Sequence, residues 1–123
     1  MFPTSNEIQK MRKKYNLQMY QSGINTFREI GRVETNALKD GVLAQKYKEL
    51  IALGISISNK CYGWIEYHVS RAADAGTSRD EILEATAVAV ALGGGMADWP
   101  ARFVFKVLEE LESKQKKAKN KAS

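Results

Sequence analysis

Residues 58–92 read SNKCYGWIEYHVSRAADAGTSRDEILEATAVAVAL, and this stretch decides the fold because it predicts two helices and the turn between them. A first helix is predicted over residues 61–75. Gly76 follows it, and glycine readily adopts the left-handed conformation that ends many helices. Ser78 and Glu81 have the spacing of a capping box, in which both side chains satisfy free N–H groups at a helix start. The stretch therefore predicts an αα-hairpin with alanine-rich faces.

The segment before this hairpin is also predicted to be helical. Asp40 and Gly41 form a turn, and apolar side chains then recur at helical spacing over residues 42–57. Ser58 and Asn59 are candidate N-caps for the next helix, because their short polar side chains can accept hydrogen bonds from its first N–H groups.

The two ends of the chain continue the helical pattern. Thr4 and Glu7 form a second capping-box pattern, which predicts a helix close to the N-terminus. A shorter helix is expected over residues 20–36. Three glycines at 93–95 end the second helix of the hairpin, and a last helix is expected after Pro100. The chain is thus expected to be all-α, with about six helices and no sheet.

Composition indicates one ordinary folded domain. The chain has 123 residues, of which 44% are hydrophobic, and we expect a single domain over residues 1–113 followed by a basic tail at 114–123. No apolar run approaches the roughly 20 residues that span a bilayer. The N-terminus lacks the pattern of a signal peptide, and a single cysteine excludes an intrachain disulfide framework. A cytoplasmic location is therefore expected.

The net charge of +5 comes from the tail. Residues 114–123 carry five lysines and no acid, so residues 1–113 hold 14 basic and 14 acidic side chains. Such a tail is typically a solvated helix end that complements the helix dipole. Nucleic-acid binding requires basic residues on a folded face with aromatic residues among them. Neither nucleic acid nor a membrane is therefore expected as a partner.

The only cysteine, Cys61, and the only histidine, His68, lie seven residues apart. Two helical turns separate them, so both side chains project from nearly the same line of the predicted helix. Cys61 would lie in the first turn, where the helix dipole and the adjacent Lys60 favour a thiolate. Because two turns span about 10 Å, a proton would pass between them through a bridging group. The pair predicts a thiol site.

Simpler interpretations of the same residues remain open. A lone cysteine is often a small buried apolar residue, and aromatic neighbours such as Trp64 often serve only to pack. One cysteine and one histidine give two soft ligands, whereas zinc requires three or four, so no metal site is predicted. No pattern for a cofactor, a phosphate-binding glycine loop or a serine hydrolase is present.

Residues 38–105 contain a series of short motifs in a distinctive order. They are Leu38-Lys39-Asp40-Gly41, Lys46-Tyr47-Lys48-Glu49-Leu50-Ile51, Cys61-x-x-Trp64-x-x-x-His68, Ala75-Gly76, Asp80-Glu81-Ile82, Gly93-Gly94 and Pro100-Ala101. This series resembles the alkylhydroperoxidase D and carboxymuconolactone decarboxylase family. Redox members of that family carry a glutamate followed, twelve residues later, by Cys-x-x-Cys-x-x-x-His. Glu49, Cys61 and His68 match the glutamate, the first cysteine and the histidine, and Trp64 replaces the second cysteine.

The resemblance implies a peroxiredoxin-like, thiol-dependent oxidoreductase with the alkylhydroperoxidase D-like helical fold. Cys61 would be the reactive thiol, His68 the base and Glu49 the relay that orients it. In the family's peroxidases the second cysteine attacks the peroxide, so here Cys61 itself would have to react. Its reduction would need an external thiol or Cys61 of the partner subunit.

Two further functions stay open under the same resemblance. A cofactor-free decarboxylase or lactone-processing enzyme would use His68 and Glu49 on a lactone acid, with Arg71, or alternatively Arg102, holding the substrate. A scaffold or ligand-binding member would have lost catalysis, with Trp64 filling the former site. The family also implies a homotrimer or homohexamer, and the alanine-rich residues 85–91 would suit close packing either between subunits or within the chain.

Overall fold

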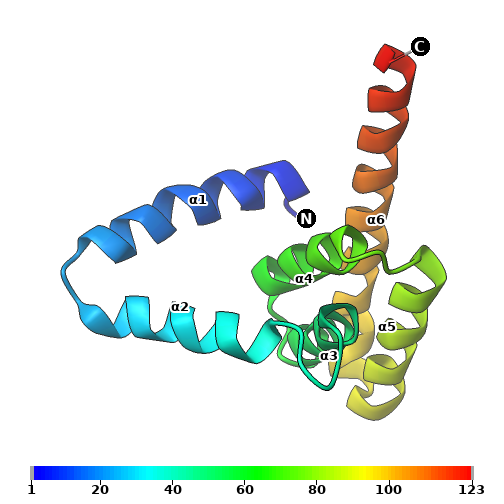
Figure 1. The fold of residues 1–123 in the computed structure, drawn as a ribbon. Helices are drawn as coiled ribbons and strands as arrows, with labels where there is room; N and C mark the ends of the chain where they lie inside the picture. The colour runs from blue at the N-terminus through cyan, green and yellow to red at the C-terminus, as the bar shows by residue number, and fades with distance from the viewer. Residues whose placement is uncertain (1, 123) are drawn as a thin grey trace.

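Six helices and no strand make up residues 2–122, the part of the chain that the computed structural model describes (Figure 1). The all-α prediction and its number of helices are confirmed. The helices are α1 (Ser5–Gln21), α2 (Asn25–Leu38), α3 (Gln45–Ser58), α4 (Tyr62–Asp74), α5 (Arg79–Gly93) and α6 (Gly95–Ala122). Among these described helices, none is both long enough and apolar enough to cross a membrane.

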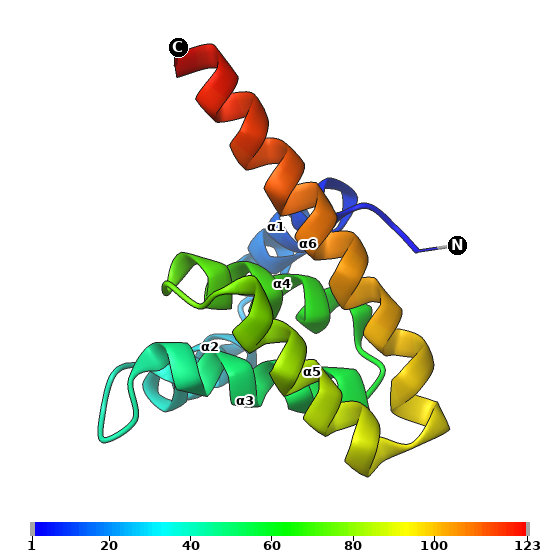
Figure 2. The same ribbon diagram turned by 90° about the vertical axis from the view of Figure 1, so that its right-hand side faces the viewer.

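The last four helices form a bundle, and the first two form an arm beside it. Helix α3 packs along α4 and α5, and α6 packs across the same two helices. Helices α1 and α2 fold back on each other, and the arm extends away from the bundle (Figures 1 and 2). Helix α1 touches α4 and α2 touches α3. The arm therefore meets the bundle on its α3–α4 side.

The hydrophobic core lies mainly within the four-helix bundle, and Ile8 of α1 joins it. Its buried apolar side chains include Leu53 and Ile57 from α3, Ile65 and Val69 from α4, Ile82 from α5, and Phe103, Val104 and Val107 from α6. Burial of such side chains stabilises the folded state by about 1.5–3 kcal/mol each. In contrast, no residue of α2 is buried. Burial in the bundle therefore provides most of the stability of the fold, and α2 is held mainly by its contacts with α1 and α3.

The two helices of residues 58–92 are present, but their pairing was predicted incorrectly. Helices α4 and α5 touch each other only weakly, and each packs instead against α3 and α6. Only part of the alanine-rich face lies inside the chain, since Ala89 is buried while Ala87 and Ala91 are exposed. A short turn does not force two helices to pack when other apolar faces are available.

The capping predictions are confirmed at three helix ends. The capping boxes of Thr4 with Glu7 and of Ser78 with Glu81 are both formed. The hydrogen bonds from the Ser78 backbone and side chain lower the pKa of Glu81. Gly76 has φ +91° and follows α4 as expected.

The start of α4 differs from the prediction. Ser58 still belongs to α3 and Asn59 is its C-cap, so neither is the N-cap of the next helix. Lys60 adopts a left-handed φ of 55°, and the Cys61 N–H donates to the Ser56 carbonyl at 3.0 Å. This tight reversal makes Cys61 the N-cap of α4 and places it one residue before the first turn.

Three other helix boundaries also differ from the prediction. Helix α2 begins at Asn25 and contains Gly31, whereas a helix over 20–36 was expected, and α3 begins at Gln45 rather than at residue 42. Helix α6 begins at Gly95, so Pro100 lies inside it. Pro100 is the sixth residue of α6, just beyond the first turn, and its ring removes one backbone hydrogen bond of the helix. The basic tail continues α6 and projects beyond the bundle (Figure 2).

Candidate functional site

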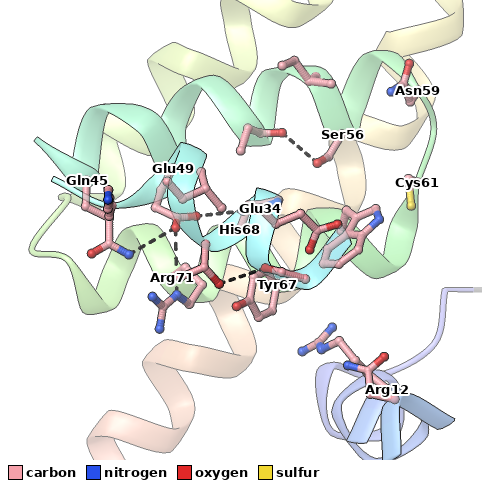
Figure 3. Close-up of a pocket in the computed structure, with 18 of the residues that line it drawn as sticks. Arg12, Glu34, Gln45, Glu49, Ser56, Asn59, Cys61, Tyr67, His68 and Arg71 are labelled. Atoms are coloured by element: carbon pink, nitrogen blue, oxygen red, sulfur yellow. Dashed lines mark hydrogen bonds and ion pairs between the residues drawn. The ribbon is translucent and has the colours of Figure 1, made fainter. Parts of the chain in front are cut away.

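The residues that the sequence singled out line one cavity between the arm and the bundle. The cavity has a volume of about 580 Å³. Glu49 reaches it from α3, and Cys61, Trp64, His68 and Arg71 reach it from α4 and its N-cap. Figure 3 shows Glu49, His68 and Arg71 grouped together, while Cys61 lies apart from them, on the right of the view. The structure thus brings all five predicted site residues to one cavity.

The centre of the cavity wall is a buried pair formed by Glu49 and His68. The Glu49 Oε2 and His68 Nδ1 atoms lie 2.7 Å apart, Glu49 is fully buried, and His68 is 8% exposed. The other carboxylate oxygen of Glu49 accepts from Gln45 Nε2 at 3.4 Å and lies 3.9 Å from Arg71 Nε. The contact at Nδ1 fixes the imidazole ring and leaves Nε2 to exchange a proton with a ligand.

Aromatic rings surround the imidazole of His68. Trp64 stacks against it with ring centres 5.7 Å apart, and Tyr67 meets it edge-on at 5.1 Å. Trp64 and Tyr67 also touch each other at 5.5 Å. These rings give the cavity an apolar surface next to a titratable group, a combination typical of sites for small organic molecules.

Cys61 is half-buried and lies at the N-terminus of α4. Helix N-termini stabilise anions, because unpaired N–H groups and the helix dipole point toward them. No hydrogen bond joins the thiol to His68 in the part of the chain that the structure describes. Proton transfer between the two side chains therefore requires a water molecule or the ligand itself.

Arg12 and Glu66 form a polar network beside the cavity, and neither was among the predicted site residues. Glu66 is fully buried on α4, and its Oε1 atom accepts from Arg12 Nη2 at 2.6 Å. Its Oε2 atom accepts from Ser5 Oγ, Gln9 Nε2 and Ser70 Oγ. Ser5, Gln9 and Arg12 lie at helical spacing on α1, so this polar stripe was the one available signal. The network anchors α1 to the bundle.

The hydrogen bonds around Glu66 affect its titration. Burial alone would raise the pKa of Glu66, but hydrogen bonds from Gln9, Arg12 and Ser5 and the charge of Arg12 outweigh it, so the pKa lies below its ordinary value of 4.5. The unfolded chain therefore takes up a proton at Glu66 before the folded chain does as the pH falls.

A pH dependence of stability follows from this shift. We expect the free energy of unfolding to fall once the pH drops below about 4.5, as unfolded Glu66 becomes protonated, and to keep falling until folded Glu66 is protonated too. Urea denaturation at a series of pH values measures this loss. A Glu66→Gln variant should show a shallower decline, and an unchanged decline would contradict the assignment.

The two arginines considered for substrate binding lie in different places. Arg71 is at the rim of the cavity, 44% exposed and close to Glu49. Arg102 lies on α6 away from the cavity, where it pairs with Asp98 at 3.1 Å and stacks over Trp99. Arg102 is therefore not positioned to hold a ligand in this cavity.

The arm supplies the wall opposite the bundle. Helix α1 contributes Arg12, Asn16 and Tyr20, and α2 contributes Gly31, Glu34, Thr35 and Leu38. Apart from Leu38, these residues precede the family-like motifs, so the N-terminal part of the chain helps to enclose the site. Among residues 2–122, no cluster of three or more His, Cys, Asp or Glu side chains is arranged to hold a metal ion.

Comparison with known proteins gives consistent matches. The model of the carboxymuconolactone decarboxylase family matches residues 25–109. Uncharacterized protein 4 in cox locus of Paracoccus denitrificans is 34% identical over 73 residues, which cover 59% of this chain and 66% of that protein. An uncharacterized protein of Cupriavidus necator is 32% identical over 59 residues, which cover 48% of this chain and 52% of that protein. The chain thus spans just under two thirds and about half of these curated relatives.

Solved structures match over nearly the whole chain. Two crystal structures from Thermotoga maritima, both 28% identical, give TM-scores of 0.86 and 0.84, covering 90% and 91% of this chain and 97% and 95% of the matched chains. The protein is described as a carboxymuconolactone decarboxylase family protein for which involvement in an antioxidative response has been suggested. A Legionella pneumophila protein of the same family, 28% identical, gives a TM-score of 0.72 over 86% of this chain and 91% of its own.

Proposed function

The chain belongs to the carboxymuconolactone decarboxylase family, and from this premise we propose that it is a thiol-dependent oxidoreductase that reduces organic hydroperoxides at Cys61. The observation that carries the proposal is the buried Glu49–His68 pair in the same cavity as a half-buried thiol at a helix N-terminus. The antioxidative response suggested for the Thermotoga maritima protein agrees with this chemistry.

The proposed reaction begins with proton removal from Cys61. His68, oriented by Glu49, accepts this proton through a water molecule or through the bound hydroperoxide. The thiolate sulfur then attacks the terminal peroxide oxygen, a sulfur–oxygen bond forms and the oxygen–oxygen bond breaks. The departing alkoxide then accepts the proton that His68 took from Cys61. Cys61 thereby becomes a sulfenic acid, and the hydroperoxide becomes an alcohol.

Reduction of the sulfenic acid requires thiols from outside the chain, because Cys61 is its only cysteine. One thiol condenses with the sulfenic acid, releases water and forms a mixed disulfide. A second external thiol then attacks that disulfide, which releases Cys61 as a thiol and joins the two external thiols in a disulfide. A cytoplasmic location is proposed as well, since a reducing compartment supplies such thiols.

Intact-mass analysis of the reduced protein after brief exposure to an organic hydroperoxide tests the proposal. With a sulfenic-acid trap present, we expect one rapid oxidation at Cys61, and the Cys61→Ser variant should show none. If the thiol reacts no faster than a free cysteine derivative in solution, the proposed function is wrong.

The second candidate is a cofactor-free decarboxylase or lactone-processing enzyme acting on a lactone acid. The Glu49–His68 pair favours it, because this pair needs no thiol to act as acid and base, and Arg71 at the rim can hold a carboxylate. This enzyme would tolerate Cys61→Ser but not His68→Ala. A non-catalytic binding protein would show no turnover in either variant or in the wild type.

We also propose that the chain forms a homo-oligomer, a trimer or a hexamer. The support is the amount of apolar surface that the single chain leaves exposed. Ile30 and Val33 on α2 are more than half exposed, as are Ile51 on α3 and Val88 and Leu92 on α5. Large apolar patches on a soluble chain usually mark interfaces. Light scattering during size-exclusion chromatography should give three or six times the chain mass of 13.8 kDa, and a monomer or a dimer would contradict the proposal.

A further inference from the structure

Arg12 is the one basic side chain that α1 contributes to the cavity wall. Three contacts with α4 hold its guanidinium in place. Nη2 donates to Glu66 Oε1 at 2.6 Å, Nη1 donates to the Gly63 carbonyl at 3.3 Å, and the group lies over the Tyr67 ring at 4.8 Å. The position of this positive charge is therefore set before any ligand arrives.

The guanidinium keeps hydrogen-bonding capacity toward the cavity. A guanidinium has five N–H donors, and the contacts with Glu66 and Gly63 use one on each terminal nitrogen. The Arg12 side chain is 21% exposed and lines the cavity. In Figure 3 it lies across the cavity from the Glu49–His68 pair, on the side of α1. A ligand next to His68 can thus extend toward Arg12.

The charges of the lining favour an anionic ligand. Its basic side chains are Arg12, Lys39 and Arg71, and its carboxylates are Glu34 and Glu49. Glu49 already faces His68 and Arg71, whereas Glu34 comes from the opposite wall on α2 and is exposed. Glu66, the counter-ion of Arg12, is buried beneath the wall and does not line the cavity.

Much of the remaining lining is apolar or aromatic. Leu38, Ile55, Trp64 and the ring of Tyr67 offer surface for the body of an organic molecule. The cavity volume of about 580 Å³ lies within the range of pockets that hold drug-sized ligands.

We propose that Arg12 is a specificity-determining residue that recognises a negatively charged group, so that this cavity selects organic acids with an apolar body. Glu66 acts as its positioning residue. The inference rests on the proposed function only for the reacting end of the substrate, which would be the hydroperoxide group. Recognition of the charged end is independent of the thiol.

Binding of an unreactive pair of probes tests the proposal without any turnover. Naphthoate and the neutral naphthamide have the same ring system and nearly the same shape, and isothermal titration calorimetry measures both dissociation constants. We expect the wild-type protein to bind naphthoate about tenfold more tightly, as a charge-assisted pair with a guanidinium implies. The Cys61→Ser protein should show the same preference.

The decisive variant is the double substitution Arg12→Gln with Glu66→Gln. It removes one charge of each sign, so the net charge is unchanged and no unpaired carboxylate stays buried. We expect the preference for naphthoate to disappear while the affinity for naphthamide stays the same. Ser5→Ala is the matched control, because it weakens the same anchor of α1 without touching the cavity. This control should keep the preference.

Three results would overturn the proposal. The first is a wild-type protein that binds both probes equally. The second is a double variant that keeps its preference, which would assign the recognition to another cation such as Arg71. The third is a Ser5→Ala protein that loses the preference as fully as the double variant. That result would mean that Arg12 only anchors α1 to the bundle and does not recognise the ligand. An unreactive Cys61 would refute the proposed function and leave the binding result intact.

Discussion

Replacement of His68 by alanine is expected to slow the oxidation of Cys61 by an organic hydroperoxide about a hundredfold, because a positioned general base contributes at least that factor. The imidazole is the one histidine ring of the chain, and its contact of 2.7 Å with Glu49 fixes its orientation. Intact-mass analysis at short reaction times, with a sulfenic-acid trap, gives the rate for each variant.

Glu49 should contribute less than His68 to the rate of Cys61 oxidation, because it acts only by orienting the imidazole ring of His68. Glu49→Gln keeps the shape of the side chain and removes the charge, so a smaller slowing is expected. Glu84→Gln is the matched control, since Glu84 is an exposed glutamate on α5 and should react at the wild-type rate. If His68→Ala and wild type react equally fast, the imidazole is not the base that activates the thiol.

Replacement of Arg12 by glutamine alone is expected to lower the free energy of unfolding by about 3 kcal/mol. The reason is the carboxylate of Glu66, which is fully buried and has Arg12 as its charged partner at 2.6 Å. Removing the guanidinium leaves a buried charge that neutral donors stabilise only in part. Urea denaturation at neutral pH measures the loss.

The double variant provides the control for this effect. Adding Glu66→Gln to Arg12→Gln removes the uncompensated charge, so most of the lost stability should return. The coupling between the two residues follows from comparing both single variants with the double variant. Lys13 is exposed, so Lys13→Gln gives the baseline for a surface substitution. If Arg12→Gln alone lowers the free energy of unfolding no more than Lys13→Gln does, the Arg12–Glu66 pair does not anchor α1 to the bundle.

Local sequence signals predicted the helices well, because capping is a short-range interaction. Thr4, Glu7, Ser78 and Glu81 form their capping boxes from residues only three apart, and Gly76 ends α4 through its own backbone freedom. The predictions that depended on distant residues were less accurate. The pairing of α4 with α5 was wrong, because apolar faces on α3 and α6 compete for the same surfaces.

Some of the residues that line the cavity were predicted, and others depended on the tertiary structure. Glu49, Cys61, Trp64, His68 and Arg71 came from spacing and from a family resemblance, and the structure places all of them on one cavity. The start of α4 could not be predicted from candidate caps, since the left-handed turn at Lys60 depends on how α3 and α4 reverse.

The sequence by itself determined an all-α chain and the positions of most helices, and it singled out Cys61 and His68 as a candidate pair. Those features depend on residues that are close together in the chain, whereas Glu49 was named only through the family resemblance. Only the tertiary structure decided that Glu49 on α3 touches His68 on α4 and that Arg12 on α1 lines the same cavity. Arg12 and Glu66 are 54 residues apart, and the energy that joins them arises only when both helices are packed together.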